Sequence, residues 1–303
     1  MWPTSVRRLF CLYQRRCKFL PAGPCSKGPH RSSSSDFSQT THDALYPGHI
    51  PTTLLQKSLL AVGSGVTALQ NPYRHDMVAV LGETTGHLAL VQLRESMRND
   101  PEGFSILMWV NDTIFERVCT VLRRSNPFVF RERPRIRLST LDLNKMSLMP
   151  DGSFGREYLC FLDDNHVTPD SRADVKFVDD EELAYVMQRY REVHDFLHTL
   201  LGMPTNMLGE VAVKIFEAAN TGLPMCVLGA VLGPLRLKTS HLQTLFKTLG
   251  PWALQNGRKA RCVLNVFYER RWEQNVEELR EELNIDPPPV TVAKRSTHRA
   301  AEH

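Results

Sequence analysis

Hydrophobic residues recur along most of this chain with the period of an α-helix. The clearest run lies between Asp179 and Gly202, where apolar residues return at every third or fourth position. That spacing places them on one side of a helix. Asp179 and Glu182 have the spacing of a capping box, and glycine commonly follows the last helical residue. We therefore predict a long helix that begins after Asp179 and ends at Gly202.

The same period predicts helices elsewhere, and the chain has neither an alternating strand pattern nor an internal repeat. Turn-forming residues predict breaks between the helices, for example at 82–86, at 100–103 and at Gly250-Pro251. The predicted helices cover residues 51–70, 73–81, 87–97, 111–124, 155–162, 206–220, 240–249, 252–255 and 269–283. The pattern indicates an all-α fold built as a single compact multi-helix domain.

The stretch Gly222–Leu235 is apolar on all sides. Pro224 suits the first turn of a helix, and Pro234 suits its end. One interpretation is a buried core helix that packs closely at Gly229 and Gly233, and the other is one wall of a groove for a long lipid. The stretch is about 14 residues long, fewer than the roughly 18 that a membrane-spanning helix needs. No spanning helix is predicted.

Residues 1–35 differ from the rest of the chain in charge. They contain seven Lys and Arg residues, no Asp or Glu, interspersed apolar residues and a serine run. That composition is typical of a mitochondrial transit peptide, and a disordered basic tail is the alternative. Cleavage is expected around Arg31 to Ser35.

Without residues 1–35 the chain keeps 30 basic and 33 acidic residues, a net charge of −3. This balance argues against nucleic acid as a partner. The scattered cysteines form no C-x-x-C pair, which fits a reducing compartment such as the mitochondrial matrix. We predict a transit peptide at 1–35, a linker at 36–45, one helical domain at 46–289 and a disordered tail at 290–303.

Four residues near the end of the long helix form a candidate metal site. His194 and His198 stand four apart and share a helix face, with Asp195 between them, and Glu210 follows in the next predicted helix. Imidazole and carboxylate groups are zinc ligands, and they also suit manganese or iron. The spacing predicts a metal site at a helix–turn–helix junction, with Thr205 capping the second helix.

Salt bridges are the competing explanation for the two carboxylates. Arg191 lies four residues before Asp195, and Lys214 lies four residues after Glu210, so each pair could form on a helix surface. The motif also differs from the H-E-x-x-H of zinc proteases, because Asp stands at its second position. Spacing alone leaves these alternatives open.

The sequence VKFVDDEELAYVMQRYREVHDFLHTLLGMPTNMLGE, which ends at Glu210, resembles the Coq-four family of mitochondrial ubiquinone (coenzyme Q) biosynthesis proteins. The resemblance extends from Tyr46 through Pro287 and includes YPGHIPTTLLQKSLLAVGSG, GETTG, RPRI and WEQNVEELREEL. The family's zinc motif is H-D-x-x-H, then eleven residues, then Glu. His194, Asp195, His198 and Glu210 meet it in full.

The resemblance implies a helical, peripheral protein on the matrix side of the mitochondrial inner membrane. It implies a multi-subunit complex with other ubiquinone-biosynthesis proteins, binding of a polyprenylated benzoate or quinone lipid, and Zn²⁺ or another divalent metal at the four motif residues. It leaves a homo-oligomer open.

The resemblance also implies a lyase reaction: decarboxylation at ring carbon one of 4-hydroxy-3-methoxy-5-polyprenylbenzoate to 2-methoxy-6-polyprenylphenol. An oxidative version would put a hydroxyl group in place of the carboxylate. An acid must supply a proton to that carbon in the simple version, and Asp195 and Glu210 are candidates. The alternative is a non-catalytic lipid-binding scaffold that organises the complex around a structural metal.

Overall fold

The computed structural model describes residues 44–71, 74–107 and 133–292. The predicted transit peptide, most of the linker, the helix predicted at 111–124 and most of the tail therefore lie outside the described residues. The helices are α2 (Leu54–Gln70), α3 (His75–Thr85), α4 (His87–Asn99), α5 (Pro101–Leu107), α7 (Leu143–Ser147), α8 (Phe154–Asn165), α9 (Glu181–Leu201), α10 (Met207–Thr221), α11 (Pro224–Leu232), α12 (Thr239–Thr244), α13 (Gly250–Lys259) and α14 (Val276–Glu282). Within these ranges the only β-type pairing is one isolated bridge, so the all-α prediction is confirmed.

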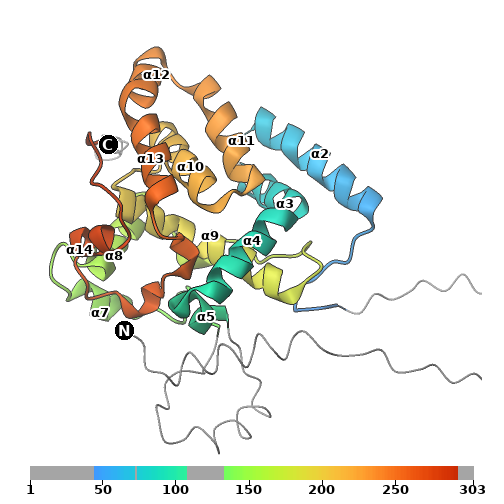
Figure 1. Ribbon diagram of the computed structural model, residues 1–303, viewed down its shortest axis with the longest axis horizontal. Coiled ribbons are helices and arrows are strands. Elements are labelled where there is room, and N and C mark those ends of the chain that lie inside the picture. Colours follow the sequence, from blue (N-terminus) through green and yellow to red (C-terminus); the bar gives the residue numbers. More distant parts are fainter. Residues whose placement is uncertain (1–43, 72–73, 108–132, 293–303) are drawn as a thin grey trace, which may run out of the picture. The chain divides into compact units, whose positions relative to one another are not determined.

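The long predicted helix, α9, is the central element of the fold (Figure 1). It packs against α4, α8, α10 and α14 and is buried along almost its whole length, charged residues included. Its N-cap is Asp180, which accepts a hydrogen bond from Leu183 N at 2.8 Å, rather than the predicted Asp179. Gly202 ends the helix as predicted, in the left-handed conformation with φ of 62°.

An aromatic cluster fixes the rotation of α9 about its own axis. Phe196 makes edge-on contact with Tyr158 of α8, with ring centroids 4.6 Å apart, and with Trp272 at 5.6 Å. Phe154 stacks on Trp272 at 5.4 Å. Because Phe196 is two residues from both His194 and His198, about 200° around the helix, its packing turns the two histidines to the opposite side. Each such aromatic pair contributes about 0.5–1.5 kcal/mol beyond its burial.

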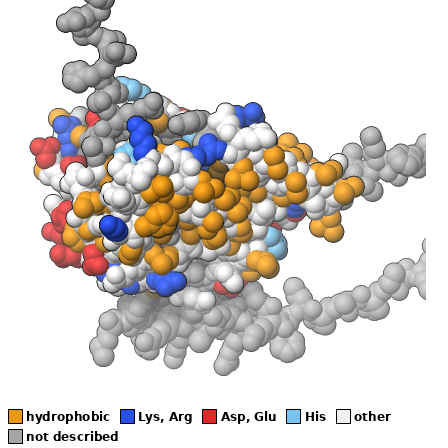
Figure 2. Space-filling view, turned by 90° about the horizontal axis from the view of Figure 1, so that it is seen from above, with side chains coloured by type: hydrophobic (Ala, Val, Ile, Leu, Met, Phe, Trp, Pro, Cys, Tyr) orange, Lys and Arg blue, Asp and Glu red, His pale blue; other side chains and the backbone are white. Residues whose placement is uncertain are grey.

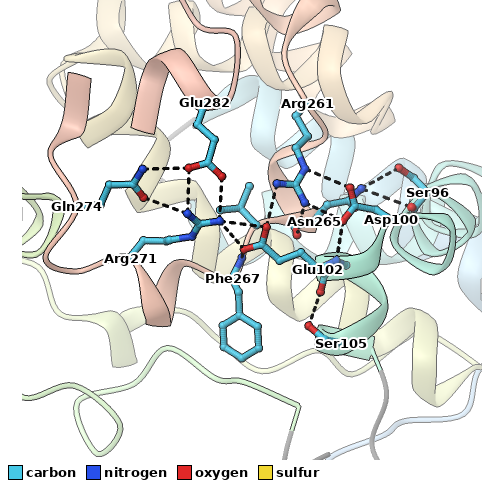
Figure 3. A network of polar contacts seen from close by, with 12 residues as sticks. Ser96, Asp100, Glu102, Ser105, Arg261, Asn265, Phe267, Arg271, Gln274 and Glu282 are labelled. Carbon is cyan, nitrogen blue, oxygen red and sulfur yellow. Dashed lines mark hydrogen bonds and ion pairs between the residues drawn. The ribbon is translucent and has the colours of Figure 1, made fainter. Parts of the chain in front are cut away.

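The prediction of a loop at 100–103 is wrong, because helix α5 begins at Pro101. Asp100 accepts hydrogen bonds from the backbone of Glu102 and Gly103 at 2.9 and 3.0 Å, which caps the new helix. The carboxylates of Asp100 and Glu102 also bind arginines that lie far along the chain, as Figure 3 shows. Arg261 pairs with Asp100 at 2.7 Å and with Glu102 at 2.9 Å, and Arg271 pairs with Glu102 at 3.2 Å. These long-range ion pairs hold α5 against the C-terminal part of the chain.

Three other boundaries were predicted incorrectly. The turn at 82–86 is the last turn of α3, and only Gly86 separates it from α4. No break occurs at Gly250-Pro251, because a π-helical turn (Leu245–Leu249) leads directly into α13. Pro251 lies in the first turn of α13, where its missing N–H is tolerated. The last helix is shorter than predicted and begins only at Val276.

The apolar stretch Gly222–Leu235 is not a buried core helix. Only Met225 and Cys226 of α11 are buried, while Val231 is 64% exposed. Pro224 occupies the first turn as predicted, and a 3₁₀ turn (Gly233–Arg236) replaces the last predicted turn. The helix therefore has one face against the protein and an apolar face outside it.

Candidate metal centre

Three of the four motif residues converge where α9 meets α10. The helix α9 carries His194 and His198 on one face, and Asn206 caps α10 by accepting from Gly209 N at 3.0 Å. The predicted cap, Thr205, donates to the side chain of Asn165 instead. This start of α10 places Glu210 in its first turn, opposite the two histidines.

The ligand atoms of His194, His198 and Glu210 all lie within 4.8 Å of one another. Nε2 of His198 is 3.3 Å from Oε1 of Glu210, and Nε2 of His194 is 3.7 Å from Oε2. The imidazole planes are nearly perpendicular, at 88°. Both ring nitrogens and both carboxylate oxygens thus face one small volume, which is the arrangement that a divalent cation takes.

The opposite nitrogen of each imidazole is held by an oxygen acceptor. Nδ1 of His194 is 2.7 Å from Oε1 of Glu217, and Nδ1 of His198 is 3.0 Å from the carbonyl oxygen of Met203. Each Nδ1 therefore carries the proton when the ring is neutral, which leaves the Nε2 lone pair toward Glu210. Nε2 of His198 is buried and makes no hydrogen bond within the described residues. A metal ion would satisfy that atom, so these residues fit the metal that the motif implies.

Glu217 contacts the candidate site directly, and the sequence prediction missed it. Its side chain is fully buried, and its Oε2 accepts from Lys214 Nζ at 2.7 Å and from the Tyr190 hydroxyl at 2.9 Å. Burial opposes its ionisation, but Lys214 and His194 outweigh that effect and hold the pKa of Glu217 far below its usual range. Glu217 lies seven residues after Glu210, hence on the same face two turns later, and that spacing was the available signal.

Shifts in the pKa values of His194 and Glu210 describe the charge state of the site. Burial and Lys214 favour the neutral imidazole of His194, but Glu217 and Glu210 outweigh them and raise its pKa above the ordinary value. Burial opposes ionisation of Glu210, but His198 and His194 hold its pKa well below the usual range. Burial also raises the pKa of the nearby Cys226 thiol to about 12, so this cysteine stays protonated and is not a thiolate ligand.

Asp195 is not one of the converging residues. Its carboxylate is buried and forms an ion pair with Arg172 Nη2. Its role as a metal ligand stays a prediction.

Neither of the two salt bridges predicted as alternatives forms within α9 or α10. Arg191 pairs with Glu83 of α3, rather than with Asp195. Lys214 pairs with Glu217, rather than with Glu210. Neither Asp195 nor Glu210 is therefore explained as an ordinary pair on its own helix surface.

The model of the family described as coenzyme Q (ubiquinone) biosynthesis protein Coq4 matches residues 46–118 and 120–289. The chain belongs to the Coq4 family. A Coq4 relative, the mitochondrial ubiquinone biosynthesis protein COQ4 homolog of Danio rerio, is 68% identical over 248 residues, which are 82% of this chain and 83% of the relative. The Homo sapiens homolog is 61% identical over 248 residues, 82% of this chain and 85% of the relative.

The Coq4 helical fold also occurs in a solved structure. The crystal structure of a Nostoc punctiforme protein described as a ubiquinone biosynthesis protein aligns with a TM-score of 0.51 at 17% identity, covering 75% of this chain and 97% of that chain. At this identity the likeness concerns the fold alone. Among the described residues, no helix is long and apolar enough to cross a membrane.

Proposed function

We propose that this Coq4 protein is a metal-dependent decarboxylase of ubiquinone biosynthesis, with His194, His198 and Glu210 as metal ligands. The observation that carries the proposal is the convergence of three protein ligands, with each histidine fixed through its Nδ1. Three protein ligands leave a coordination position for water or substrate, as in catalytic zinc sites, whereas structural zinc sites use four. This favours the enzyme over the non-catalytic scaffold.

The proposed substrate is 4-hydroxy-3-methoxy-5-polyprenylbenzoate, and the products are carbon dioxide and 2-methoxy-6-polyprenylphenol. A proton from solvent adds to ring carbon one, and the bond from that carbon to the carboxyl carbon breaks. The electron pair of that bond restores the aromatic ring, and the carboxylate leaves as carbon dioxide. The para-hydroxyl group donates electron density toward the same carbon. A bound divalent cation would supply Lewis-acid stabilisation of negative charge on the substrate.

The surrounding residues fix the tautomer of His194 and the charge of the two glutamates. Glu217 holds the proton of His194 at Nδ1, and Lys214 balances the buried charge of Glu217. Because its pKa is well below the usual range, Glu210 is ionised at neutral pH and acts as a ligand rather than as the proton donor.

The proposed surface for the inner membrane lies over α2 and residues 227–254, and we call it the apolar face. Figure 2 shows hydrophobic side chains gathered on this side of the molecule. Of eighteen large exposed apolar side chains in the described residues, fourteen belong to residues 45–69 and 227–254. The most exposed of them are Leu54 at 86%, Leu235 at 80% and Leu55 at 71%. Apolar surface of this extent is typical of a protein or membrane contact.

The charges beside the apolar face favour an anionic membrane as its partner. Residues 44–75 and 218–268 contain no Asp or Glu, although the chain after residue 35 has a net negative charge. Basic residues such as Lys238 and Lys247 are exposed there. Basic and apolar side chains together bind anionic lipid surfaces. The proposal includes a matrix-side position and other ubiquinone-biosynthesis proteins as partners.

The apolar face also adjoins the metal centre. Cys226 of α11 contacts Tyr190 and Glu217 with its thiol, while Leu228 and Val231 of the same helix are exposed. A polyprenyl tail lying along the outer side of α11 would therefore reach from the lipid phase toward the site. We propose α11 as one wall of the site for that tail.

Purified His194→Ala and Glu210→Ala proteins test the enzymatic proposal, with Glu278→Ala on the exposed side of α14 as the control. We expect both site variants to lose metal and decarboxylation of the prenylated benzoate, while the control keeps both. Mass spectrometry of the product separates simple from oxidative decarboxylation. A folded site variant that keeps full turnover would contradict the proposal. If the unaltered protein shows no turnover and the site variants lose complex formation, the scaffold is favoured instead.

A further inference from the structure

The ion pair between Asp195 and Arg172 is a built feature beside the metal centre. The Asp195 side chain is 3% exposed, whereas that of Arg172 is 31% exposed, so the pair presents its cation outward. Nη2 and Nε of Arg172 donate to the two oxygens of Asp195. Buried ion pairs are often no more stable than apolar residues of the same size, so stability alone does not account for it.

The segment around Arg172 is fixed to the protein on both sides. Asp170 accepts from the backbone of Leu138 at 3.1 Å, and the carbonyl of Ala173 accepts from Arg191 at 2.8 Å. Val175 N donates to the buried side chain of Gln188 at 3.1 Å. The guanidinium is therefore preorganised, which lowers the entropic cost of binding a ligand.

Arg172 lines a polar pocket of about 160 Å³. The acidic residues of that pocket already have other partners. Glu192 binds Arg135 at 2.7 Å and the backbone of Ile136 at 2.9 Å, and Asp174 binds Arg137 at 2.6 Å. Among the described residues, none accepts a hydrogen bond from Nη1 of Arg172. Nη1 of Arg172 is thus available to donate to a ligand in the pocket.

The guanidinium is also linked electrostatically to the metal centre. Burial disfavours its charge, but Asp195 and then Glu210 outweigh burial and raise the pKa of Arg172 above its ordinary value. Arg172 lines the polar pocket and also contacts Asp195, which directly follows the candidate ligand His194 in α9. A carboxylate group there would meet a fixed guanidinium, which binds carboxylates through two parallel N–H donors.

We propose that Arg172 binds the carboxylate of the substrate, and that Asp195 positions Arg172 rather than binding the metal. This inference rests on the proposed function, because it names the residue that would distinguish the benzoate substrate from its decarboxylated product. Arg172 selects a ring that carries a carboxylate and holds that group next to His194, His198 and Glu210.

Equilibrium binding tests this inference without relying on turnover. Zinc-loaded Arg172→Gln and Asp195→Asn proteins are titrated with 4-hydroxy-3-methoxy-5-polyprenylbenzoate and separately with 2-methoxy-6-polyprenylphenol, which lacks the carboxylate. We expect each variant to weaken benzoate binding about tenfold to hundredfold, with phenol binding and zinc content unchanged. Arg172→Lys should recover part of the loss. Arg156→Gln, in which the native side chain is 33% exposed, is the matched control and should change neither affinity.

Arg172→Gln alone leaves Asp195 buried without its partner, so the double variant Arg172→Gln/Asp195→Asn is measured as well. It restores electrical neutrality and should show the same selective loss of benzoate. Equal loss of both ligands would overturn the role of Arg172, and loss of zinc from Asp195→Asn would overturn the role of Asp195. Selective benzoate binding in a protein without turnover would support Arg172 while refuting the decarboxylase.

Discussion

Two glutamates on one face of α10 would have different tasks in the proposed metal centre. Glu210, with its side chain one third exposed, faces the Nε2 atoms of the histidines. Glu217 is fully buried and accepts a hydrogen bond from Nδ1 of His194 and another from the Tyr190 hydroxyl, while Lys214 balances its charge. Outer partners of this type orient a ligand histidine and raise its basicity. Sequence spacing identified the first glutamate but not the second.

Replacing Glu217 with Gln should weaken zinc binding about 10- to 100-fold, because the amide no longer holds the Nδ1 proton of His194 as a charged acceptor does. Zinc affinity is measured by competition with a chelator. The exposed residue Glu278, changed to Gln, is the control. Unchanged zinc affinity in a folded Glu217→Gln protein would mean that the bond to His194 does not support metal binding.

Zinc affinity should fall with decreasing pH and begin to fall above the ordinary histidine value of about 6.5. The reason is that His194 has a raised pKa, and a proton on its Nε2 competes with the metal at every pH below that value. Chelator competition between about pH 8 and about pH 6 measures the midpoint. Because Glu217 favours the protonated imidazole, Glu217→Gln should move this midpoint to lower pH. A midpoint at higher pH in Glu217→Gln would contradict this prediction.

Among the helices, α10, which carries Glu210 and Glu217, packs very closely against α13. α13 approaches α10 at Gly257, where an added Cβ would lie 2.4 Å from the carbonyl oxygen of Phe216 and 2.8 Å from Cβ of Ala219. Gly63 in α2 has nothing within 4 Å of the same position. Packing therefore leaves no room for a side chain at Gly257, whereas Gly63 has room for one. The two helical glycines form a matched pair for substitution by alanine.

Gly257→Ala should destabilise the fold by about 1–3 kcal/mol, since the overpacking of a backbone contact outweighs the gain of about 1 kcal/mol in helix propensity. Gly63→Ala should be neutral or stabilising by up to about 1 kcal/mol. Chemical denaturation of both variants measures the free energies of unfolding. Equal effects of the two substitutions would show that the contact between α10 and α13 adjusts without cost.

A charged substitution on the exposed apolar side of α11 tests its role as a wall for the lipid tail. Leu228→Asp should reduce binding of a polyprenylated ligand while zinc content stays unchanged, because the side chain is 40% exposed on the outer side of the helix. Ligand titration and metal analysis of the same preparation provide the comparison. Equal loss of lipid and zinc would instead identify Leu228 as a position that the fold requires.

At the scale of the whole molecule, apolar and acidic residues occupy different segments. Most of the exposed apolar residues lie in segments that contain no acidic residue. The carboxylates of Figure 3 lie elsewhere, at the start of α5 and at Glu282, where they pair with Arg261 and Arg271. One side of the described structure is thus suited to an anionic lipid surface. The fold achieves this without a helix that could span the bilayer, within the described residues.

Leu59→Glu and Val231→Glu should each reduce binding to vesicles of phosphatidylcholine and phosphatidylglycerol about tenfold or more, since burial of such a side chain contributes roughly 1.5–3 kcal/mol. Leu148→Glu is the control, because Leu148 is 86% exposed but lies outside the apolar face. Vesicle flotation measures binding. If Leu148→Glu had the same effect, a general loss of hydrophobicity would explain it. Binding that needs no anionic lipid would contradict the charge argument.

Local sequence patterns were sufficient to predict most of the helices and the candidate ligands, because both depend on residues that are close in the chain. Helical period, caps such as Gly202 and the i, i+4 spacing of His194 and His198 involve residues within one or two turns of each other. The same local character explains the incorrect boundaries. A proline or an acidic turn reads as a break, whereas Asp100 became a helix cap supported by Arg261, 161 residues away.

The partner of each buried charge depends on the packing of helices that are distant in the chain. Arg191 has Asp195 four residues away on its own helix, yet it binds Glu83, 108 residues away, and Asp195 binds Arg172 instead. A buried charge takes whichever opposite charge the packed helices bring to it, and sequence distance does not limit that choice. For the same reason the tertiary structure alone selected Glu217 for His194 and left the outer face of α11 uncovered.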